Sequence, residues 1–253
     1  MKNQHAYPLS DLNFKTEGQG KPLVLLHGWG GNLDSWFPVR QTLKNDFKVV
    51  SLDLPGFGRS PLPRTVWGVQ EYADFIKNFL DDLKTDKPTV IGHSFGGQIA
   101  LRFARDFPEL TGKLILVDSA GIRRKSPKTL AYQTAAKTGK LIFSIPGLKR
   151  FESKAKSKLY NRIGEHDYEQ SGTLKETFKK VIDQDMRPIL KDVGCPTLIV
   201  WGENDKDTPI NDAKLMNLTI PNSRLSILTG TGHFSYLEKP EEFCTLVKDF
   251  VDE

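Results

Sequence analysis

The segment Thr-Val-Ile-Gly-His-Ser-Phe-Gly-Gly-Gln at residues 89–98 indicates the fold of this chain. It begins with a short, β-branched apolar run, and a helical pattern follows with apolar residues at Ile99, Ala100, Phe103, Ala104 and Phe107. The segment therefore predicts a strand, a sharp turn and a helix. A serine in such a turn is held in a strained conformation, and it needs glycines two positions to either side because side chains there would collide with the neighbouring strand and helix. Ser94 is thus a candidate nucleophile.

Similar apolar runs recur along the first half of the chain, at residues 23–27, 49–54 and 113–117. Helical patterns lie between them, and the clearest places six apolar side chains on one stripe over residues 69–83. Strands that alternate with helices in this way form right-handed crossovers. The chain is therefore predicted to have an α/β fold, with a mostly parallel, twisted sheet and helices on both faces.

The alternation stops after Ala120 and resumes at Cys195 with two further apolar runs and a closing helix from Pro240. The stretch between looks helical, and residues 9–16 alternate as an antiparallel edge strand would. We therefore expect a core formed by residues 1–121 and 192–253, with a helical cap inserted at residues 122–191.

The composition excludes several classes of protein. The chain has 253 residues, of which 38% are hydrophobic and 26% charged, as in globular domains. The sequence contains neither the apolar block of a signal peptide nor the roughly 18 apolar residues of a membrane span. Its two cysteines, Cys195 and Cys244, are far apart and suggest reduced thiols. We therefore expect a cytoplasmic protein without a membrane span.

Two motifs follow the later predicted strands. Gly-Thr-Gly-His-Phe at residues 230–234 follows the last strand, and Trp-Gly-Glu-Asn-Asp at residues 201–205 follows the strand before it. A serine nucleophile needs a histidine base, and the base needs an orienting carboxylate. Together with the Gly-His-Ser-Phe-Gly elbow, these motifs resemble the α/β-hydrolase superfamily over nearly the whole chain.

The family's catalytic residues occur in the order serine, acid, histidine. The resemblance therefore implies a triad of Ser94, Asp205 and His233. Glu203, Asp207 and Asp118 remain alternative acids, and Asp118 is preferred among these three.

The segment Leu-His-Gly-Trp-Gly-Gly at residues 26–31 is similar to the family's His-Gly loop. The resemblance implies that the backbone N–H groups of Trp29 and Phe95 form the oxyanion hole. The side chains expected to contact substrate are those of Trp29, Phe95, Leu141 and Phe143. The remaining motifs, His27, His93 and residues 53–60, are expected to pack loops and form turns rather than to catalyse.

Cofactor chemistry is not indicated. The five histidines and two cysteines lack metal-ligand spacing, and no glycine pattern of a dinucleotide or phosphate loop occurs. Aromatic residues are not interleaved with basic ones as in nucleic-acid readers. We therefore expect no metal, no cofactor and no nucleic-acid partner.

The leading hypothesis is a serine carboxylester hydrolase that acts on small or medium acyl substrates through an acyl-Ser94 intermediate. Serine at position 94 disfavours haloalkane dehalogenases and epoxide hydrolases, which place aspartate there. Carbon–carbon bond hydrolases keep the serine but usually have a Gly-Pro-Gly type loop that this chain lacks, and they remain an alternative. Perhydrolase-type members share the triad, and a non-enzymatic ligand receptor or signalling protein on the same fold is a further alternative.

The charge of the chain is uneven. Residues 122–191 contain 17 basic and 7 acidic residues, a net charge of +10, whereas the rest of the chain carries a net charge of −5. An acidic partner or an anionic substrate would be attracted by this segment, although a solvated helix face explains the charge equally well. The basic candidates are Arg123, Arg124, Lys125, Lys149, Arg150, Lys154, Lys156 and Lys158.

The His-Gly-Trp-Gly loop, the chain length and the cap placement also resemble the methyl esterase family of biotin synthesis, whose basic cap docks an acyl-carrier protein. That family typically has tryptophan before its nucleophile, where this chain has His93. This more specific function therefore remains an alternative.

Overall fold

A seven-stranded sheet forms the centre of the molecule. The structure is a computed structural model that describes residues 7–123 and 174–253. Its strand order is β1-β3-β2-β4-β5-β6-β7. The bounds are β1 Phe14–Glu17, β2 Pro22–Leu26, β3 Lys48–Leu52, β4 Thr89–His93, β5 Lys113–Val117, β6 Thr197–Gly202 and β7 Ser223–Leu228. β1 pairs antiparallel with β3 and all the other pairs are parallel, which confirms the predicted mostly parallel sheet.

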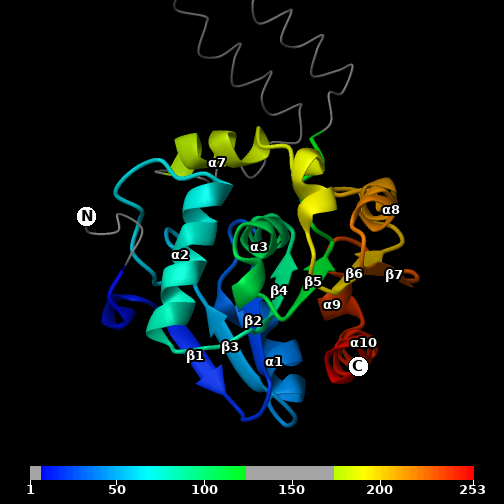
Figure 1. Ribbon diagram of the computed structural model, residues 1–253, viewed down its shortest axis with the longest axis horizontal. Coiled ribbons are helices and arrows are strands. Elements are labelled where there is room, and N and C mark those ends of the chain that lie inside the picture. The colour runs from blue at the N-terminus through cyan, green and yellow to red at the C-terminus, as the bar shows by residue number, and fades with distance from the viewer. Residues whose placement is uncertain (1–6, 124–173) are drawn as a thin grey trace, which may run out of the picture.

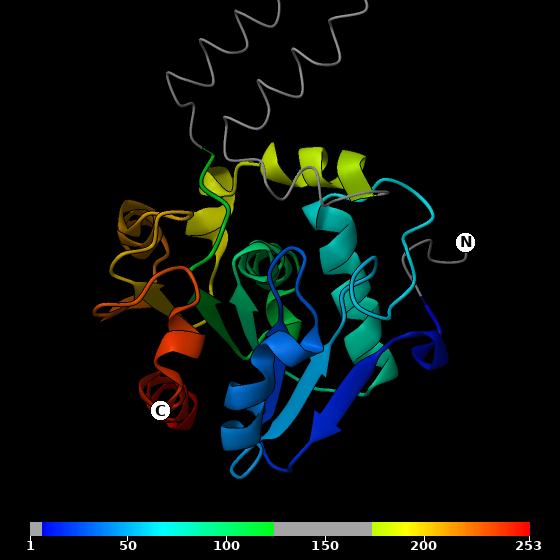
Figure 2. The ribbon, with the colours of Figure 1, turned by 180° about the vertical axis from the view of Figure 1, so that it is seen from behind.

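Helices cover both faces of this sheet, as predicted (Figure 1). One face carries α2 Val69–Asp82, α3 Phe95–Asp106 and α8 Ile210–Thr219, and the other carries α1 Phe37–Leu43, α9 Ser235–Glu238 and α10 Pro240–Asp252. The view from behind again shows α1 next to α10 (Figure 2). Short 3-10 helices lie at η2 Leu33–Trp36 and η3 Pro108–Leu110.

The apolar runs in the sequence are continuous because each face of the sheet packs against its own hydrophobic core. Within β4, Val90 belongs to the core under α2 and α3, whereas Ile91 belongs to the core under α1 and α10. Because successive strand residues point to opposite faces and both faces are covered, both positions are apolar.

The N-terminal strand is shorter than the alternating pattern of residues 9–16 predicts. The 3-10 helix η1 Leu9–Asp11 precedes β1. Pro8 starts this turn, and its carbonyl accepts a hydrogen bond from the Asp11 N–H at 2.9 Å. The antiparallel edge strand itself is confirmed, but a proline-initiated turn occupies the first part of the predicted range.

Residues 174–192 pack against the α2 and α3 side of the core. They form α7 Lys175–Ile182 and η6 Arg187–Asp192, and Figure 1 shows α7 crossing the end of α2. The Trp67 N–H donates to the Thr177 hydroxyl at 3.2 Å, and Lys180 pairs with Glu71 at 2.6 Å. The rest of the expected cap, including Leu141, Phe143 and the basic residues from Arg124 to Lys158, lies outside the described residues.

Two smaller expectations concern the membrane and the cysteines. Within residues 7–123 and 174–253, no helix is long and apolar enough to cross a membrane. Cys195 and Cys244 are free and buried. Burial raises the pKa of both thiols, that of Cys244 to about 11. Both cysteines are therefore free, buried thiols in the structure, and their reduced state stays a prediction.

Candidate active site

Ser94 lies in the turn between β4 and α3. Its φ of 51° and ψ of −113° are a combination that residues other than glycine rarely adopt. The turn is held by main-chain hydrogen bonds: the Ser94 N–H donates to Val117 at 3.0 Å, and the Ser94 carbonyl accepts from Gln98 at 3.2 Å and from Ala120 at 3.0 Å. The strained residue is therefore fixed by the end of β5 and the first turn of α3.

The glycines on either side of Ser94 permit this close packing. A Cβ atom on Gly92 would lie 2.3 Å from the carbonyl oxygen of Gly96, and a Cβ atom on Gly96 would lie 2.2 Å from the carbonyl oxygen of Leu26. Both contacts are with main-chain atoms, which cannot rotate away as a flexible side chain can. The predicted steric requirement for glycine at these two positions is confirmed.

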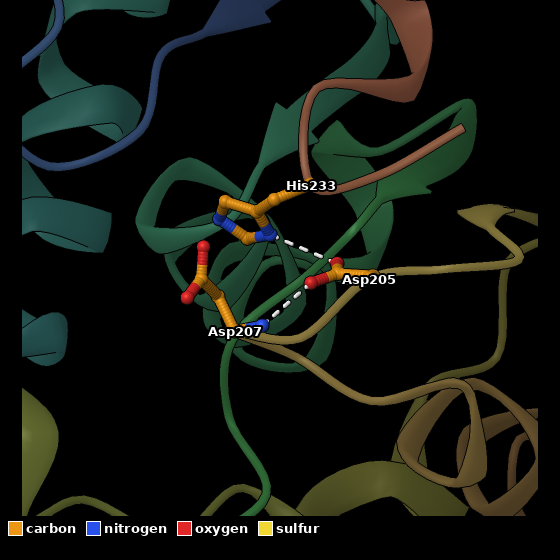
Figure 3. A group of neighbouring side chains, drawn as sticks. All are labelled: Asp205, Asp207 and His233. Carbon is orange, nitrogen blue, oxygen red and sulfur yellow. Dashed lines mark hydrogen bonds and ion pairs between the residues drawn. The ribbon is translucent and has the colours of Figure 1, made fainter. Parts of the chain in front are cut away.

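His233 and Asp205 reach Ser94 from the loops that follow β7 and β6. His233 Nε2 lies 3.1 Å from Ser94 Oγ. On the other side of the ring, His233 Nδ1 lies 2.8 Å from Asp205 Oδ2, as Figure 3 shows. A carboxylate can only accept, so Nδ1 carries the proton, and the Nε2 lone pair is left to accept from the Ser94 hydroxyl. The structure therefore brings together the three residues that the sequence predicts, in the geometry of a nucleophile, a base and an orienting carboxylate.

The loop after β6 surrounds the Asp205 carboxylate with donors. Oδ1 accepts from the N–H groups of Asp207 at 2.8 Å and Thr208 at 2.9 Å, and Oδ2 accepts from the Thr208 hydroxyl at 2.6 Å. Thr208 is absent from the sequence-based predictions. An aspartate followed closely by small polar residues is typical of a turn in which the carboxylate bonds the next N–H groups, and that signal could have identified Thr208.

Burial and hydrogen bonding have opposite effects on the pKa values of Asp205 and His233. Burial raises the pKa of Asp205, but hydrogen bonds from His233 and Thr208 outweigh it and hold the pKa below its ordinary value. Burial lowers the pKa of His233, but the hydrogen bond to Asp205 and its negative charge outweigh burial and raise the pKa above its ordinary value. The pair thus favours an ionised acid beside an imidazole that readily accepts a proton.

Two of the alternative acids are exposed residues of this loop. Glu203 is exposed, and its Oε2 accepts from the Gly230 N–H at 2.9 Å. Asp207 is also exposed, and it meets Asp205 through its own backbone N–H. Among the described residues, Asp205 is the carboxylate that is hydrogen-bonded to His233.

Asp118, the third alternative acid, is fully buried at the end of β5. Its Oδ1 accepts from the Gly202 N–H at 2.7 Å, and its Oδ2 accepts from the Ser235 N–H at 3.1 Å and the Ser235 hydroxyl at 2.6 Å. Burial raises the pKa of Asp118 to about 7 although these donors act in the opposite direction. Asp118 therefore links the loop that carries Asp205 to the loop that carries His233.

Trp29 and Phe95 line the same cavity as Ser94. Phe95 is the first residue of α3, and the first N–H groups of a helix have no acceptor within that helix. Trp29 lies in the turn closed by the hydrogen bond from the Gly31 N–H to the Gly28 carbonyl at 3.1 Å. The donation of both N–H groups to an oxyanion remains a prediction.

The cavity has a volume of about 900 Å³. One part of its described lining is apolar: Trp29, Phe95, Ile122, Phe178, Val181, Ile182 and Phe234. The ring of Trp29 packs against Phe95 at 5.2 Å, Phe57 at 4.9 Å and Phe178 at 4.9 Å between centroids. Trp29, Phe95 and Phe178 thus form an aromatic part of the lining of the cavity that contains Ser94. The other predicted substrate contacts, Leu141 and Phe143, lie outside the described residues.

His27 and Asp53 have structural hydrogen bonds. His27 Nδ1 donates to the Gly28 carbonyl at 2.8 Å, and Nε2 accepts from the Leu54 N–H at 3.0 Å. Burial lowers the pKa of His27 to about 4, so the ring is neutral. Asp53 accepts from the N–H groups of Leu33 and Arg59, both at 2.7 Å. These contacts agree with the predicted roles in loop packing and turn formation.

Asp205, Asp207 and His233 also form a group of possible metal ligands, with atoms within 4.8 Å of one another (Figure 3). However, both Asp205 oxygens accept hydrogen bonds, and both His233 nitrogens are engaged, one by Asp205 and one by Ser94. A metal ion would have to displace these bonds, so the donor set fits a hydrogen-bonded triad better than a metal centre. The expected metal-free site stays a prediction.

Comparison with known proteins decides the family. The family model described as "Alpha/beta hydrolase family" matches residues 23–246. The chain belongs to the α/β-hydrolase family. The matched range extends from β2 to α10 and contains Ser94, Asp205 and His233.

Relatives in this family carry out different reactions. The chain is 26% identical over 251 residues to a pimeloyl-[acyl-carrier protein] methyl ester esterase from Legionella pneumophila, covering 95% of this chain and 99% of that one. It is also 26% identical over 264 residues to a 2-hydroxy-6-oxo-2,4-heptadienoate hydrolase from Pseudomonas putida, covering 95% and 92%. The structure of a thermophilic esterase from Thermogutta terrifontis matches with a TM-score of 0.73, 25% identity and coverage of 95% and 93%. Because the chain is equally identical to these two differently named hydrolases, overall sequence similarity does not indicate which substrate it uses.

Proposed function

We propose that this α/β-hydrolase is a serine carboxylester hydrolase that acts on small or medium acyl substrates. The observation that carries the proposal is the hydrogen-bond chain from Ser94 through His233 to Asp205, which starts at a strained elbow. Acyl transfer needs this arrangement because a serine hydroxyl is a weak nucleophile until a base accepts its proton. The similarity to esterases supports ester bonds as the target.

The mechanism follows from the tautomer of His233. Ser94 Oγ attacks the ester carbonyl while His233 Nε2 accepts the hydroxyl proton, and Asp205 stabilises the imidazolium. The tetrahedral intermediate then collapses: the bond to the alkoxy oxygen breaks, His233 gives its proton to the departing alcohol, and an acyl-Ser94 ester remains. Water, deprotonated by His233, attacks this ester and releases the acid and free Ser94.

The oxyanion of the intermediate requires donors that are in place before the reaction. We assign this role to the backbone N–H groups of Trp29 and Phe95, because both residues line the cavity and Phe95 begins α3. Each such donor contributes about 3–4 kcal/mol to transition-state stabilisation. The apolar wall around Trp29 then provides space for the acyl chain.

A second candidate function is hydrolysis of an ester that is attached to an acidic carrier or bears a negative charge. Its support is the similarity to the acyl-carrier-protein methyl ester esterase over 99% of that protein, together with the net charge of +10 on residues 122–191. Complementary charge would increase the rate of encounter more than the rate of the chemical step.

The experiment that tests the proposal is hydrolysis of p-nitrophenyl esters of graded acyl length by the wild type and by Ser94→Ala. A fluorophosphonate probe with peptide mapping reports whether Ser94 is activated. We expect repeated turnover by the wild type, label on Ser94, and loss of both in Ser94→Ala. Labelling of Ser94 without repeated turnover of any ester would instead favour a receptor or a carbon–carbon bond hydrolase. Absence of labelling would contradict the mechanism.

A further inference from the structure

His93 directly precedes Ser94 and makes a contact that the mechanism above does not use. Its Nε2 lies 2.8 Å from the main-chain carbonyl oxygen of His233. The two residues are 140 positions apart in the sequence, and the side chain of His93 is buried. One hydrogen bond thus connects the nucleophile turn to the loop that carries the base.

The direction of this hydrogen bond is fixed by chemistry. A carbonyl oxygen can only accept, so Nε2 of His93 carries a hydrogen and donates it. Burial, together with the nearby His233, lowers the pKa of His93 to about 3, so the ring is neutral and Nδ1 bears the lone pair. His93 is therefore a neutral donor, and it is not a second base in the proton relay.

The ring of His93 has little freedom to move. Its centroid lies 4.9 Å from the ring of Tyr236 and 5.1 Å from the ring of Phe234. A Cβ atom on Gly28 would lie 2.9 Å from His93 Nδ1, so the loop of Trp29 also approaches the ring closely. A side chain confined by such close neighbours can hold its acceptor in a defined place.

We propose that His93 is a positioning residue that sets the loop of His233 relative to Ser94. The inference rests on the proposed function. Since Ser94 is the next residue along the chain, the hydrogen bond from His93 keeps the nucleophile turn and the base loop in one arrangement. The distance of 3.1 Å between Ser94 Oγ and His233 Nε2 depends on that arrangement. Small displacements of catalytic groups cost up to about 100-fold in rate.

The test compares three substitutions. His93→Phe keeps a ring but removes the donor, and His93→Asn keeps an amide that is too short to reach the carbonyl of His233. His93→Gln places an amide N–H close to the position of Nε2. We expect kcat and the rate of fluorophosphonate labelling of Ser94 to fall about 10- to 100-fold in the Phe and Asn variants, with KM within about twofold of wild type. His93→Gln should recover most of the loss.

Thr111→Val provides a matched control far from the site. The buried Thr111 hydroxyl also donates to a main-chain carbonyl, that of Phe107, at 3.0 Å. This variant should lose stability comparably to the His93 variants yet keep kcat, KM and labelling unchanged. Thermal unfolding establishes which variants are folded, and if His93→Phe does not fold, the comparison of Asn with Gln decides.

The outcomes separate this inference from the proposed function. A wild type that neither labels nor turns over esters contradicts the proposed function. A wild type that does both, with folded Phe or Asn variants of equal kcat and labelling rate, overturns only the role of His93. A loss that Gln does not restore also overturns it, because the donor would then not be the feature that matters.

Discussion

The hydrogen bond between Asp205 and His233 shifts the pKa of both side chains. Asp205 becomes a stronger acid and His233 a stronger base, although both are largely buried. The bond also fixes the tautomer that points the Nε2 lone pair at Ser94. The acid therefore acts on both the charge and the orientation of the base.

The first prediction at this scale is a pH dependence. The base must be neutral, so kcat/KM should rise with pH through an apparent pKa above the ordinary histidine value, because Asp205 raises the pKa of His233. Asp205→Asn should lower this apparent pKa, since the hydrogen bond and charge of Asp205 are lost and only the charges of Asp118 and Asp207 still oppose the effect of burial. It should also reduce kcat by about 10⁴-fold through the wrong tautomer. Full activity in this variant, measured by ester hydrolysis, would assign the acid to another carboxylate.

The second prediction concerns Thr208, whose hydroxyl donates to Asp205 Oδ2 at 2.6 Å. Thr208→Val keeps the shape but removes this donor, and we expect kcat/KM to fall about tenfold, equivalent to about 1.4 kcal/mol. Thr208→Ser restores the hydroxyl and should recover most of the activity. Equal kcat/KM in all three proteins would show that the backbone N–H groups suffice to orient Asp205.

At the scale of elements, the site depends on strand ends that meet at one edge of a parallel sheet. β4, β6 and β7 end in the loops of Ser94, Asp205 and His233, and their carboxyl ends lie at the same edge. The loops touch closely: a Cβ atom on Gly202 would lie 2.0 Å from the carbonyl oxygen of Gly232. Residues far apart in sequence are thus brought together by the pairing of strands.

This packing predicts a stability cost for Gly96→Ala. The added Cβ would meet the Leu26 carbonyl oxygen at 2.2 Å, so we expect the free energy of unfolding to fall by about 2–3 kcal/mol. Gly194→Ala is the matched control, because Gly194 is exposed and a Cβ there meets nothing within 4 Å. Urea unfolding of both variants measures the difference. Equal stability would mean that the elbow relaxes without cost.

At the scale of the whole molecule, charge is distributed unevenly along the chain. Residues 122–191 carry a net charge of +10 and the rest of the chain −5. One basic residue of this segment that the structure describes, Arg123, lines the cavity and pairs with Asp183 at 2.8 Å. Because Arg123 lines the cavity, the effect of this charge is best tested on the kcat/KM of charged and neutral substrates.

If this charge steers substrate, salt should act selectively. Raising ionic strength from about 0.05 to 0.5 M shortens the screening length severalfold. We expect kcat/KM for an anionic ester to fall more than kcat/KM for a neutral ester of equal acyl length. A variant with Lys154, Lys156 and Lys158 replaced by Gln should reduce the difference. The same response for both esters would argue against an anionic substrate or acidic carrier.

The sequence by itself determined the fold class and the catalytic candidates. Apolar runs buried on both faces identify parallel strands, and the glycines at 92 and 96 identify the elbow, because these features depend on local sterics and on burial. The alternating pattern predicts an earlier start for β1 than the structure shows, since the turn at Pro8 occupies the first part of the predicted range.

Only the tertiary structure decided which side chains lie within hydrogen-bond distance of each other at the site. The sequence leaves Asp118, Asp207 and Glu203 as alternatives to Asp205. The packing of loops brings Asp205 within 2.8 Å of His233 and buries Asp118 against Gly202 and Ser235. The His93 donor emerges for the same reason, whereas Thr208 donates within the loop of Asp205, three residues further along the chain. Hydrogen bonds between distant loops depend on the relative placement of three strand ends, and sequence spacing gives the order of these loops but not the distances between their side chains.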